Sequence, residues 1–319
     1  MDLGKKKEKG HANGHRLIAA GGSCVSSWHA HMPEPQYRST WTDIMAVAFV
    51  QGYVSVNGLR TRYLQAGKKS DPAVVLLHGT GANWEIFSPN IAAISNQFHC
   101  LTLDLLGHGL TDKPAGAREI ADYIQHLVGF LDLMGVKKAS FIGTSLGAWI
   151  AARMALQYPE RVEKIVLLSP GGLAADLPTM QSISSVRKKA VEDPSWDNIA
   201  AVLKSVIFKA HNVTPDMVAV RQAIYQQPSM RAAMASILAL QDPIIRARNL
   251  ISREEFSSIT CPTLVIASSD DVDVFVSSAY TLGELIPGAQ LIEMQGVGHM
   301  PQFEDPSTFN QHALAFLNQ

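Results

Sequence analysis

The stretch Ala139-Ser140-Phe141-Ile142-Gly143-Thr144-Ser145-Leu146-Gly147 joins a short apolar run to a G-x-S-x-G sequence. Residues 139–142 predict a buried strand, and residues 146–157 predict a helix that begins directly after the serine. A serine between a strand and a helix, with a glycine two residues to either side, is typical of a nucleophile elbow, where the glycines relieve crowding at a strained turn. The N-terminus of the helix would also stabilise an oxyanion formed beside the serine. Ser145 is therefore the candidate nucleophile.

Strand-like and helix-like segments alternate on both sides of this stretch. Asn57-Gly58 is a strong hairpin signal between two strand-like runs. Further strands are expected at 73–77, 98–103, 162–168, 263–267 and 290–294, and helices at 119–135, 277–285 and 306–317. Short apolar strands that alternate with helices predict an α/β fold, with a mostly parallel central sheet and helices on both faces.

The segment 173–258 breaks this alternation, because its pattern is helical throughout. Prolines divide it into short helices, at Pro178, Pro194, Pro215, Pro228 and Pro243. We expect a helical cap at 173–258, inserted into a core formed by residues 51–172 and 259–319. Residues 1–50 are expected to be a flexible extension.

A serine needs a base to accept its proton. His299 is the best candidate among the eleven histidines, because it lies in a loop between the last strand and the last helix. His78 follows a strand directly and is better suited to a structural hydrogen bond, and His108 lacks a comparable placement.

The carboxylate that orients the histidine is expected between Ser145 and His299 in the chain, as is typical of this elbow. Three aspartates follow the strand at 263–267, namely Asp270, Asp271 and Asp273. Asp271 is the preferred candidate and Asp270 the second. The carboxylate would hold the imidazole tautomer and stabilise the imidazolium.

An oxyanion hole requires two backbone N–H donors. Leu146, directly after the nucleophile, would supply one of them. The loop His78-Gly79-Thr80-Gly81-Ala82 would supply the other, with Thr80 as the expected donor. Loss of one such donor typically lowers the rate by about 10²–10³.

The composition narrows the classes of partner. The formal net charge is −1, from 27 basic and 28 acidic residues, which does not favour nucleic acid or an anionic membrane. Hydrophobic residues make up 47% of the chain, but no apolar run reaches the length of a membrane span. No His/Cys cluster has metal-ligand spacing, so we expect neither a metal nor a cofactor. The expected partner is a small-molecule substrate, and a homodimer is compatible with the sequence.

Cysteine content and the first fifty residues bear on the compartment. Three scattered cysteines, Cys24, Cys100 and Cys261, argue against a disulfide framework and favour a cytoplasmic location. The basic run Lys5-Lys6-Lys7 precedes a short apolar stretch at 17–25, which leaves secretion or organelle targeting as alternatives. A start at Met45 is a further alternative.

Residues 52–319 resemble the α/β-hydrolase superfamily through the motifs described above and through Asp104-Leu105-Leu106-Gly107-His108-Gly109. Within it the chain is most similar to hydrolases of meta-cleavage products, of the 2-hydroxymuconate-semialdehyde type, which split a C–C bond in vinylogous 1,5-diketo acids. The segment from Val213 to Arg221 resembles the part of those enzymes that carries a lid arginine, so the resemblance implies that Arg221 binds the substrate carboxylate.

Helical spacing alone leaves Arg221 with two roles, since a guanidinium on an apolar stripe either extends to water or binds a buried anion.

Three positions depart from the subfamily. The subfamily usually has Asn at the position of Thr144, often has Trp at the position of Met300, and has a polar Asn at the position of Ile86. Thr144, Met300 and Gly81 join Arg221 as candidate substrate-binding residues.

Two classes of function follow. The first is a serine hydrolase that cleaves either a C–C bond in a keto acid or an ester, lactone or carbamate. The second is a non-hydrolytic receptor, lyase or cyclase on the same fold, because a fold alone does not determine function. Dehalogenases and epoxide hydrolases of this fold use an aspartate nucleophile, so Ser145 argues against both.

Overall fold

Eight strands form one mixed sheet in the order β1-β2-β4-β3-β5-β6-β7-β8. Strands β1 and β2 pair antiparallel, β2 pairs antiparallel with β4, and the remaining neighbours are parallel. The strands are β1 (Phe49–Val56), β2 (Leu59–Ala66), β3 (Ala73–Leu77), β4 (His99–Leu103), β5 (Ala139–Thr144), β6 (Val162–Leu168), β7 (Thr263–Ser268) and β8 (Gln290–Met294). The predicted α/β fold with a mostly parallel sheet is confirmed.

This computed structural model describes Met1 and residues 38–319, and Arg38–Gln319 form one unit. The basic run at Lys5, the apolar stretch at 17–25 and Cys24 lie outside the described residues. Helix α1 (Thr40–Ile44) and the start of β1 fall within the range 1–50 that was expected to be a flexible extension.

Helices cover both faces of the sheet, which explains why β3, β5 and β7 are apolar along almost their whole length. On one face α2 (Ser88–Ser95) and α13 (Pro306–Leu317) pack in one hydrophobic cluster. On the other face α3 (Ile120–Leu133), α4 (Leu146–Gln157) and α11 (Asp273–Leu285) pack in a second cluster. The short helix α12 (Pro301–Glu304) precedes α13.

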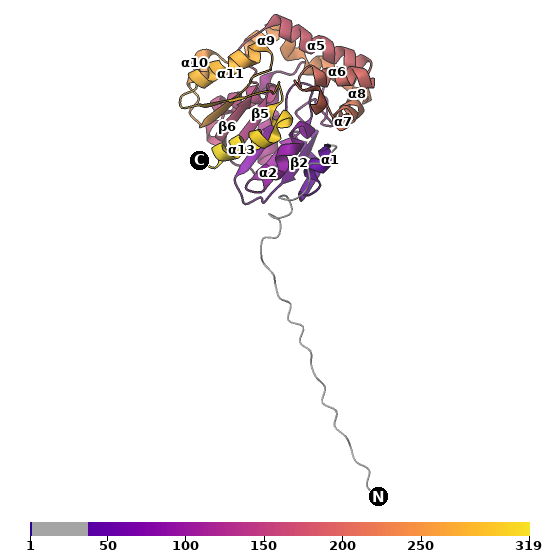
Figure 1. Ribbon diagram of the computed structural model, residues 1–319, viewed down its shortest axis with the longest axis vertical. Coiled ribbons are helices and arrows are strands. Elements are labelled where there is room, and N and C mark those ends of the chain that lie inside the picture. The colour runs from indigo at the N-terminus through magenta and orange to yellow at the C-terminus, as the bar shows by residue number, and fades with distance from the viewer. Residues whose placement is uncertain (2–37) are drawn as a thin grey trace. The chain divides into compact units, whose positions relative to one another are not determined.

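The helical cap lies between β6 and β7, as the sequence predicted. Its helices are α5 (Leu177–Glu192), α6 (Trp196–Lys204), α7 (Pro215–Tyr225), α8 (Pro228–Ile237), α9 (Pro243–Asn249) and α10 (Arg253–Ser257). Proline stands at the first or second position of α5, α7, α8 and α9. The backbone N–H at these positions makes no hydrogen bond within a helix, so proline, which lacks an N–H, fits there. Figure 1 shows α5 to α8 as one group at an edge of the domain, beyond the sheet.

Local sequence signals and the structure agree closely at most boundaries. The hairpin turn at Asn57-Gly58 has φ of 51° and 81°, the left-handed values that this turn needs. Helix α2 was not predicted, and α11 begins at Asp273, earlier than the expected 277. Cys100 is buried, whereas Cys261 is partly exposed.

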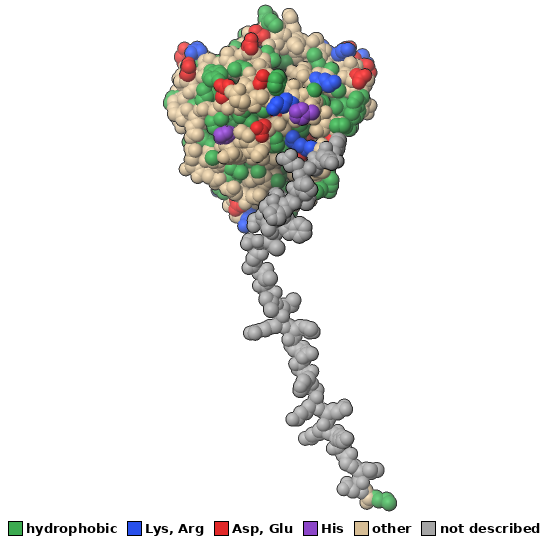
Figure 2. Space-filling view, viewed as in Figure 1, with side chains coloured by type: hydrophobic (Ala, Val, Ile, Leu, Met, Phe, Trp, Pro, Cys, Tyr) green, Lys and Arg blue, Asp and Glu red, His purple; other side chains and the backbone are tan. Residues whose placement is uncertain are grey.

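The surface carries no single-sign patch on the face seen in Figure 2, where acidic and basic side chains are interspersed among apolar and neutral ones. Among the described residues, no helix combines the length and the apolarity that a membrane span requires.

The elbow between β5 and α4 depends on close backbone packing. A Cβ at Gly147 would lie 2.0 Å from the carbonyl oxygen of Leu77 in β3, and a Cβ at Gly143 would lie 2.2 Å from the carbonyl oxygen of Gly147. Both distances are far inside van der Waals contact, so only glycine lets α4 start directly against the centre of the sheet. This packing fixes the position of Ser145.

We therefore expect Gly147→Ala to lower the free energy of unfolding by at least about 2 kcal/mol, the cost of overpacking against a rigid backbone. Gly52→Ala in β1 is the matched control, because its Cβ would meet only Tyr63 at an ordinary 3.6 Å. Denaturant unfolding of both variants measures the difference. Equal stability of the two variants would contradict the account of the elbow.

Candidate active site

Ser145 lies at the sharp turn between β5 and α4. It has φ 56° and ψ −111°, a left-handed conformation that a non-glycine residue rarely adopts. Its backbone N–H donates to the carbonyl of Leu168 at 2.9 Å, and its own carbonyl accepts from Trp149 and Gly171. These bonds to β6, α4 and the loop after β6 hold the strained turn, and a strained conformation maintained in this way is typical of a functional position.

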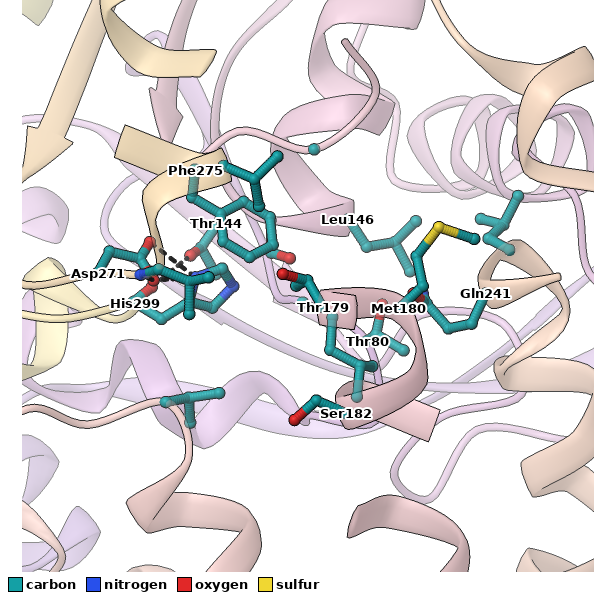
Figure 3. Close-up of a pocket in the computed structure, with 18 of the residues that line it drawn as sticks. Thr80, Thr144, Leu146, Thr179, Met180, Ser182, Gln241, Asp271, Phe275 and His299 are labelled. Carbon is teal, nitrogen blue, oxygen red and sulfur yellow. Dashed lines mark hydrogen bonds and ion pairs between the residues drawn. The ribbon is translucent and has the colours of Figure 1, made fainter. Parts of the chain in front are cut away.

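His299 and Asp271 form a bonded pair at the same edge of the sheet. The Nδ1 atom of His299 lies 2.8 Å and 3.0 Å from the two carboxylate oxygens of Asp271. The Asp271 side chain is only 3% exposed, and Phe275 packs against the imidazole with ring centroids 4.3 Å apart. Such a pair fixes the ring so that Nε2 is the atom left to accept a proton. Figure 3 shows the pair beside Thr144 and Phe275.

The other two aspartates of this loop do not contact His299. Asp270 and Asp273 are both exposed, and Asp273 begins α11. The geometry therefore brings Asp271, rather than either neighbour, to the imidazole.

His78 and His108 are buried structural groups. The Nε2 atom of His78 accepts the backbone N–H of Leu105 at 3.0 Å, so its Nδ1 carries the proton and donates to the carbonyl of Gly79 at 2.8 Å. Burial lowers the pKa of His78 to about 3, and burial also holds the pKa of His108 well below its usual value. Both rings are neutral at physiological pH, and His78 ties the loop after β3 to the loop after β4.

The two predicted oxyanion donors are available. Within the described residues, neither the N–H of Thr80 nor that of Leu146 donates to another protein group. Both residues line the pocket that contains Ser145. Two unused amides beside a serine form a suitable site for a developing oxyanion.

A pocket of about 310 Å³ contains Ser145, Asp271 and His299. Its walls come from the loops after β3, β5, β6, β7 and β8 and from the cap, and Figure 3 shows cap residues Thr179, Met180 and Gln241 opposite the His299–Asp271 pair. This volume suits a small molecule. Within the described part of the chain, no group of three or more His, Cys, Asp or Glu side chains could hold a metal ion.

Three cap arginines, Arg187, Arg221 and Arg246, also line this pocket. They are 6%, 5% and 9% exposed, and no carboxylate of the described residues lies within ion-pair distance of any of them. Burial lowers the pKa of Arg187, and repulsion from Arg221 lowers it further. A buried cation without a counter-ion is costly, so these side chains favour an anionic ligand.

Asn83 positions Arg221. The Nε atom of Arg221 donates to the amide oxygen of Asn83 at 2.9 Å, and the amide nitrogen of Asn83 donates to Glu85. Arg221 is thus buried and does not extend to water, which removes one of its two predicted roles. None of the described residues accepts a hydrogen bond from its terminal nitrogens.

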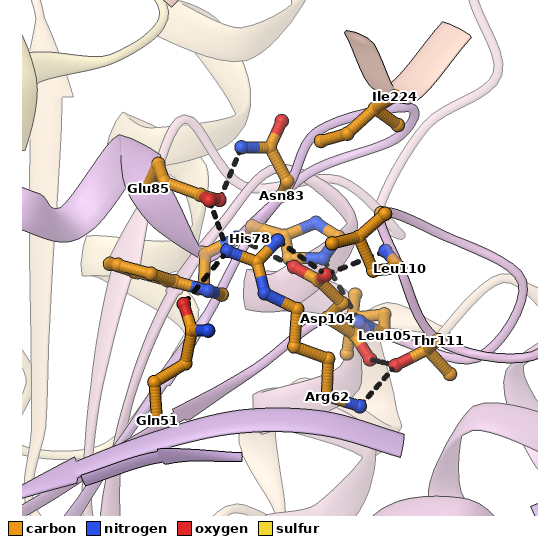
Figure 4. Close-up of polar contacts among 12 residues, drawn as sticks. Gln51, Arg62, His78, Asn83, Glu85, Asp104, Leu105, Leu110, Thr111 and Ile224 are labelled. Carbon is orange, nitrogen blue, oxygen red and sulfur yellow. Dashed lines mark hydrogen bonds and ion pairs between the residues drawn. The ribbon is translucent and has the colours of Figure 1, made fainter. Parts of the chain in front are cut away.

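The network continues from Glu85 into the core (Figure 4). Glu85 pairs with Arg62, and Arg62 also lies 3.2 Å from Asp104. Asp104 accepts further bonds from the backbone N–H groups of Trp84 and Leu110. Burial and the nearby Asp104 raise the pKa of Glu85. This network supports the loop that carries Asn83 and Thr80.

The remaining predicted substrate-binding residues differ in placement. Thr144 and Met300 line the pocket, and the Thr144 hydroxyl donates to the carbonyl of His299 at 3.3 Å. Gly81 does not line it; its carbonyl accepts from the hydroxyl of Tyr225. Ile86 contributes an apolar wall.

Sequence reasoning missed Arg187, Arg246 and Trp149 as pocket residues, and Asn83 as the hydrogen-bond partner of Arg221. Asn83 lies in the loop after β3, where the sequence indicated Thr80, Gly81 and Ile86 but gave no signal for this side chain. Arg187 is followed by two lysines, and Arg246 is two residues from exposed Arg248, so neither was distinguishable from a solvated basic residue. Trp149 belongs to the apolar helix α4 and has the pattern of a core residue.

Comparisons with known proteins agree with this fold. Residues 72–306 match the family described as alpha/beta hydrolase fold. A 2-hydroxymuconate semialdehyde hydrolase from Pseudomonas sp. (strain CF600) is 28% identical over 271 residues, which cover 82% of this chain and 91% of that protein. A 2-hydroxy-6-oxononadienedioate/2-hydroxy-6-oxononatrienedioate hydrolase from Burkholderia vietnamiensis is 29% identical, covering 82% of this chain and 92% of that protein.

Among solved structures, a meta-cleavage product hydrolase from Pseudomonas fluorescens superposes with a TM-score of 0.73 and 27% identity, covering 85% of this chain and 98% of that one. An enol-lactonase from Burkholderia xenovorans has a TM-score of 0.72 at 22% identity, covering 84% and 100%, and shows the fold alone. The family match spans strands β3 to β8, the elbow and the cap, and the chain is therefore a hydrolase that belongs to the α/β-hydrolase fold family and is related to meta-cleavage product hydrolases.

Proposed function

We propose that the chain is a serine hydrolase in which Ser145 attacks a substrate carbonyl, His299 acts as general base and Asp271 orients it. The bonded His299–Asp271 pair, in one pocket with a serine at a strained elbow, is the observation that carries this proposal. The N–H groups of Thr80 and Leu146 would stabilise the oxyanion. A receptor would not need this combination of a strained serine, an oriented imidazole and two unused amides.

We propose further that the substrate is a keto acid cleaved at a C–C bond. Arg187 and Arg221 form a cationic wall on the β3 side of the pocket, which would bind the substrate carboxylate. The two named relatives act on compounds of this kind according to their names. In this reaction a dienol is first converted to its keto form, and the carbonyl next to the scissile bond is then attacked.

Ester hydrolysis is the second candidate. Thr144, Met300 and Ile86 replace polar groups that the resemblance associates with dienol binding, and here Met300 and Ile86 present apolar surface. An ester would acylate Ser145, and water activated by His299 would release the acid.

We expect Ser145→Ala and His299→Ala each to lower kcat by at least about 10⁴-fold, because members of such a unit act together. The unfolding temperature should stay close to that of the wild type. Turnover would be followed on a p-nitrophenyl ester and on a 2-hydroxy-6-oxo-dienoate with a phenyl end. The matched control is His211→Ala, an exposed histidine in the cap. Substantial turnover by either active-site variant would reject the assignment, and the ratio of the two wild-type rates decides between C–C and ester cleavage.

For Arg221→Gln we expect KM on the dienoate to rise about 10–100-fold, since a hydrogen bond between charged groups is worth about 1.5–3 kcal/mol. KM on a neutral p-nitrophenyl ester should change little. Arg231→Gln, an exposed arginine of α8, controls for net charge. Equal responses of the acidic and neutral substrates would show that Arg221 does not bind the carboxylate.

A further inference from the structure

The third arginine of the pocket, Arg246, lies in α9 and is held on the opposite side of the nucleophile from Arg221. Arg221 bonds to Asn83, in the loop after β3, whereas Arg246 bonds to Ala174, in the segment after β6. In the sheet, β5 lies between β3 and β6. Since Ser145 follows β5, the two guanidinium groups flank it from the two neighbouring strands.

The hydrogen bonds of Arg246 leave part of its guanidinium unused. Its Nε donates to the carbonyl of Ala174 at 3.0 Å and its Nη1 to the carbonyl of Leu240 at 3.3 Å. No described residue accepts from Nη2, and burial lowers the pKa of Arg246 to about 10. The only pocket-lining carboxylates among the described residues are engaged elsewhere: Asp271 binds His299, and Asp176 caps α5 through the N–H of Thr179.

Two further polar groups at this end of the pocket lack partners. The guanidinium carbon of Arg246 lies 5.1 Å from the ring centre of Trp149, a residue that is 2% exposed. The indole Nε1 of Trp149 is buried and has no hydrogen-bond partner among the described residues. The Oε1 atom of Gln241 is likewise unpartnered, and rotation of the amide would present its N–H₂ group instead. Arg246, Trp149 and Gln241 all line the pocket.

We propose that Arg246, Trp149 and Gln241 form a second anion subsite, so that the pocket takes a substrate with two acidic groups. One carboxylate lies against Arg221 and the other against Arg246, with the reacting carbonyl between them at Ser145. A buried cation beside an unpartnered indole N–H is a donor-rich site that a carboxylate satisfies and a phenyl or methyl group does not. This inference rests on the proposed function, since it names the substrate class of the same pocket.

The test measures binding rather than turnover. Full-length protein carrying Ser145→Ala is titrated by calorimetry with saturated dicarboxylates from pentanedioate to decanedioate, and with the monocarboxylate of matching length in each case. We expect the best dicarboxylate to bind at least about tenfold more tightly than its monocarboxylate partner, the value of one hydrogen-bonded charge.

Variants then assign the effect to the subsite. Arg246→Gln should abolish the preference for the dicarboxylate, and Trp149→Phe, which keeps the ring and removes the N–H, should reduce it. Arg248→Gln is the matched control, because Arg248 is an exposed arginine of the same helix and pairs with Glu119. It should retain the full preference.

Equal affinity for dicarboxylates and monocarboxylates overturns the subsite, and so does the absence of binding by any of these acids. A preference that survives in Arg246→Gln also overturns it, and would leave Arg246 as a clamp between the cap and the segment after β6. If Arg246→Gln does not fold, the comparison of the two acids in the parent protein still decides whether the subsite exists.

Failure of the proposed function is distinguishable from failure of the subsite. A dicarboxylate that binds but is never hydrolysed in any keto-acid form rejects the reaction and keeps the subsite. Hydrolysis of a phenyl-ended keto acid by a protein that shows no preference for diacids rejects the subsite and keeps the reaction.

Discussion

The close approach of α4 to the centre of the sheet determines the position of Ser145 and of the unused N–H of Leu146 beside it. Gly147 lies against β3 and Gly143 lies against Gly147, with no room for a Cβ at either position, and Ser145 between them has a left-handed conformation. The strained turn projects the serine beyond the sheet edge and leaves the N–H of Leu146 unused. Every other catalytic group in the proposal is placed relative to this turn. His299 and Asp271 come from loops at the same edge, because parallel strands end there together.

The distribution of buried charge around the elbow makes the pocket suitable for an anionic ligand. Near the loop after β3, the carboxylates of Glu85 and Asp104 both pair with Arg62, and Asp104 also accepts from the backbone N–H of Trp84. Glu85 accepts a hydrogen bond from Asn83 as well. The arginines that line the pocket have only neutral hydrogen-bond partners. The two described carboxylates that line the pocket, Asp271 and Asp176, bind His299 and the N–H of Thr179, so the unpaired charge that faces the cavity is positive, as expected for an anionic substrate. The cap supplies all three arginines, so it is the part of the chain that selects the substrate.

The sequence predicted the fold and the reacting groups well, for physical reasons that apply to particular segments. The strands at 73–77 and 162–168 and the helix at 306–317 agree with the structure at both ends, since buried strands and capped helices have strong local patterns. The strand at 290–294 also agrees at both ends, although it is a largely exposed edge strand. Ser145, Asp271 and His299 were predictable because each follows shortly after a predicted strand, in three different loops. The substrate-binding residues were harder to predict, because they depend on how cap helices pack. Arg187 and Arg246 have the sequence context of surface arginines, and only the fold turns them toward the cavity. Gly81 was expected in the pocket, but it instead accepts a bond from Tyr225.

The central claim is that Ser145 is an activated nucleophile, and the most direct measurement is covalent labelling by a fluorophosphonate followed by mass spectrometry of the proteolysed protein. We expect one adduct, on the peptide that contains Ser145, formed quickly in the wild type and much more slowly when His299 is replaced by alanine. Absence of an adduct under conditions in which the protein is folded, or an adduct on a different serine, would contradict the account.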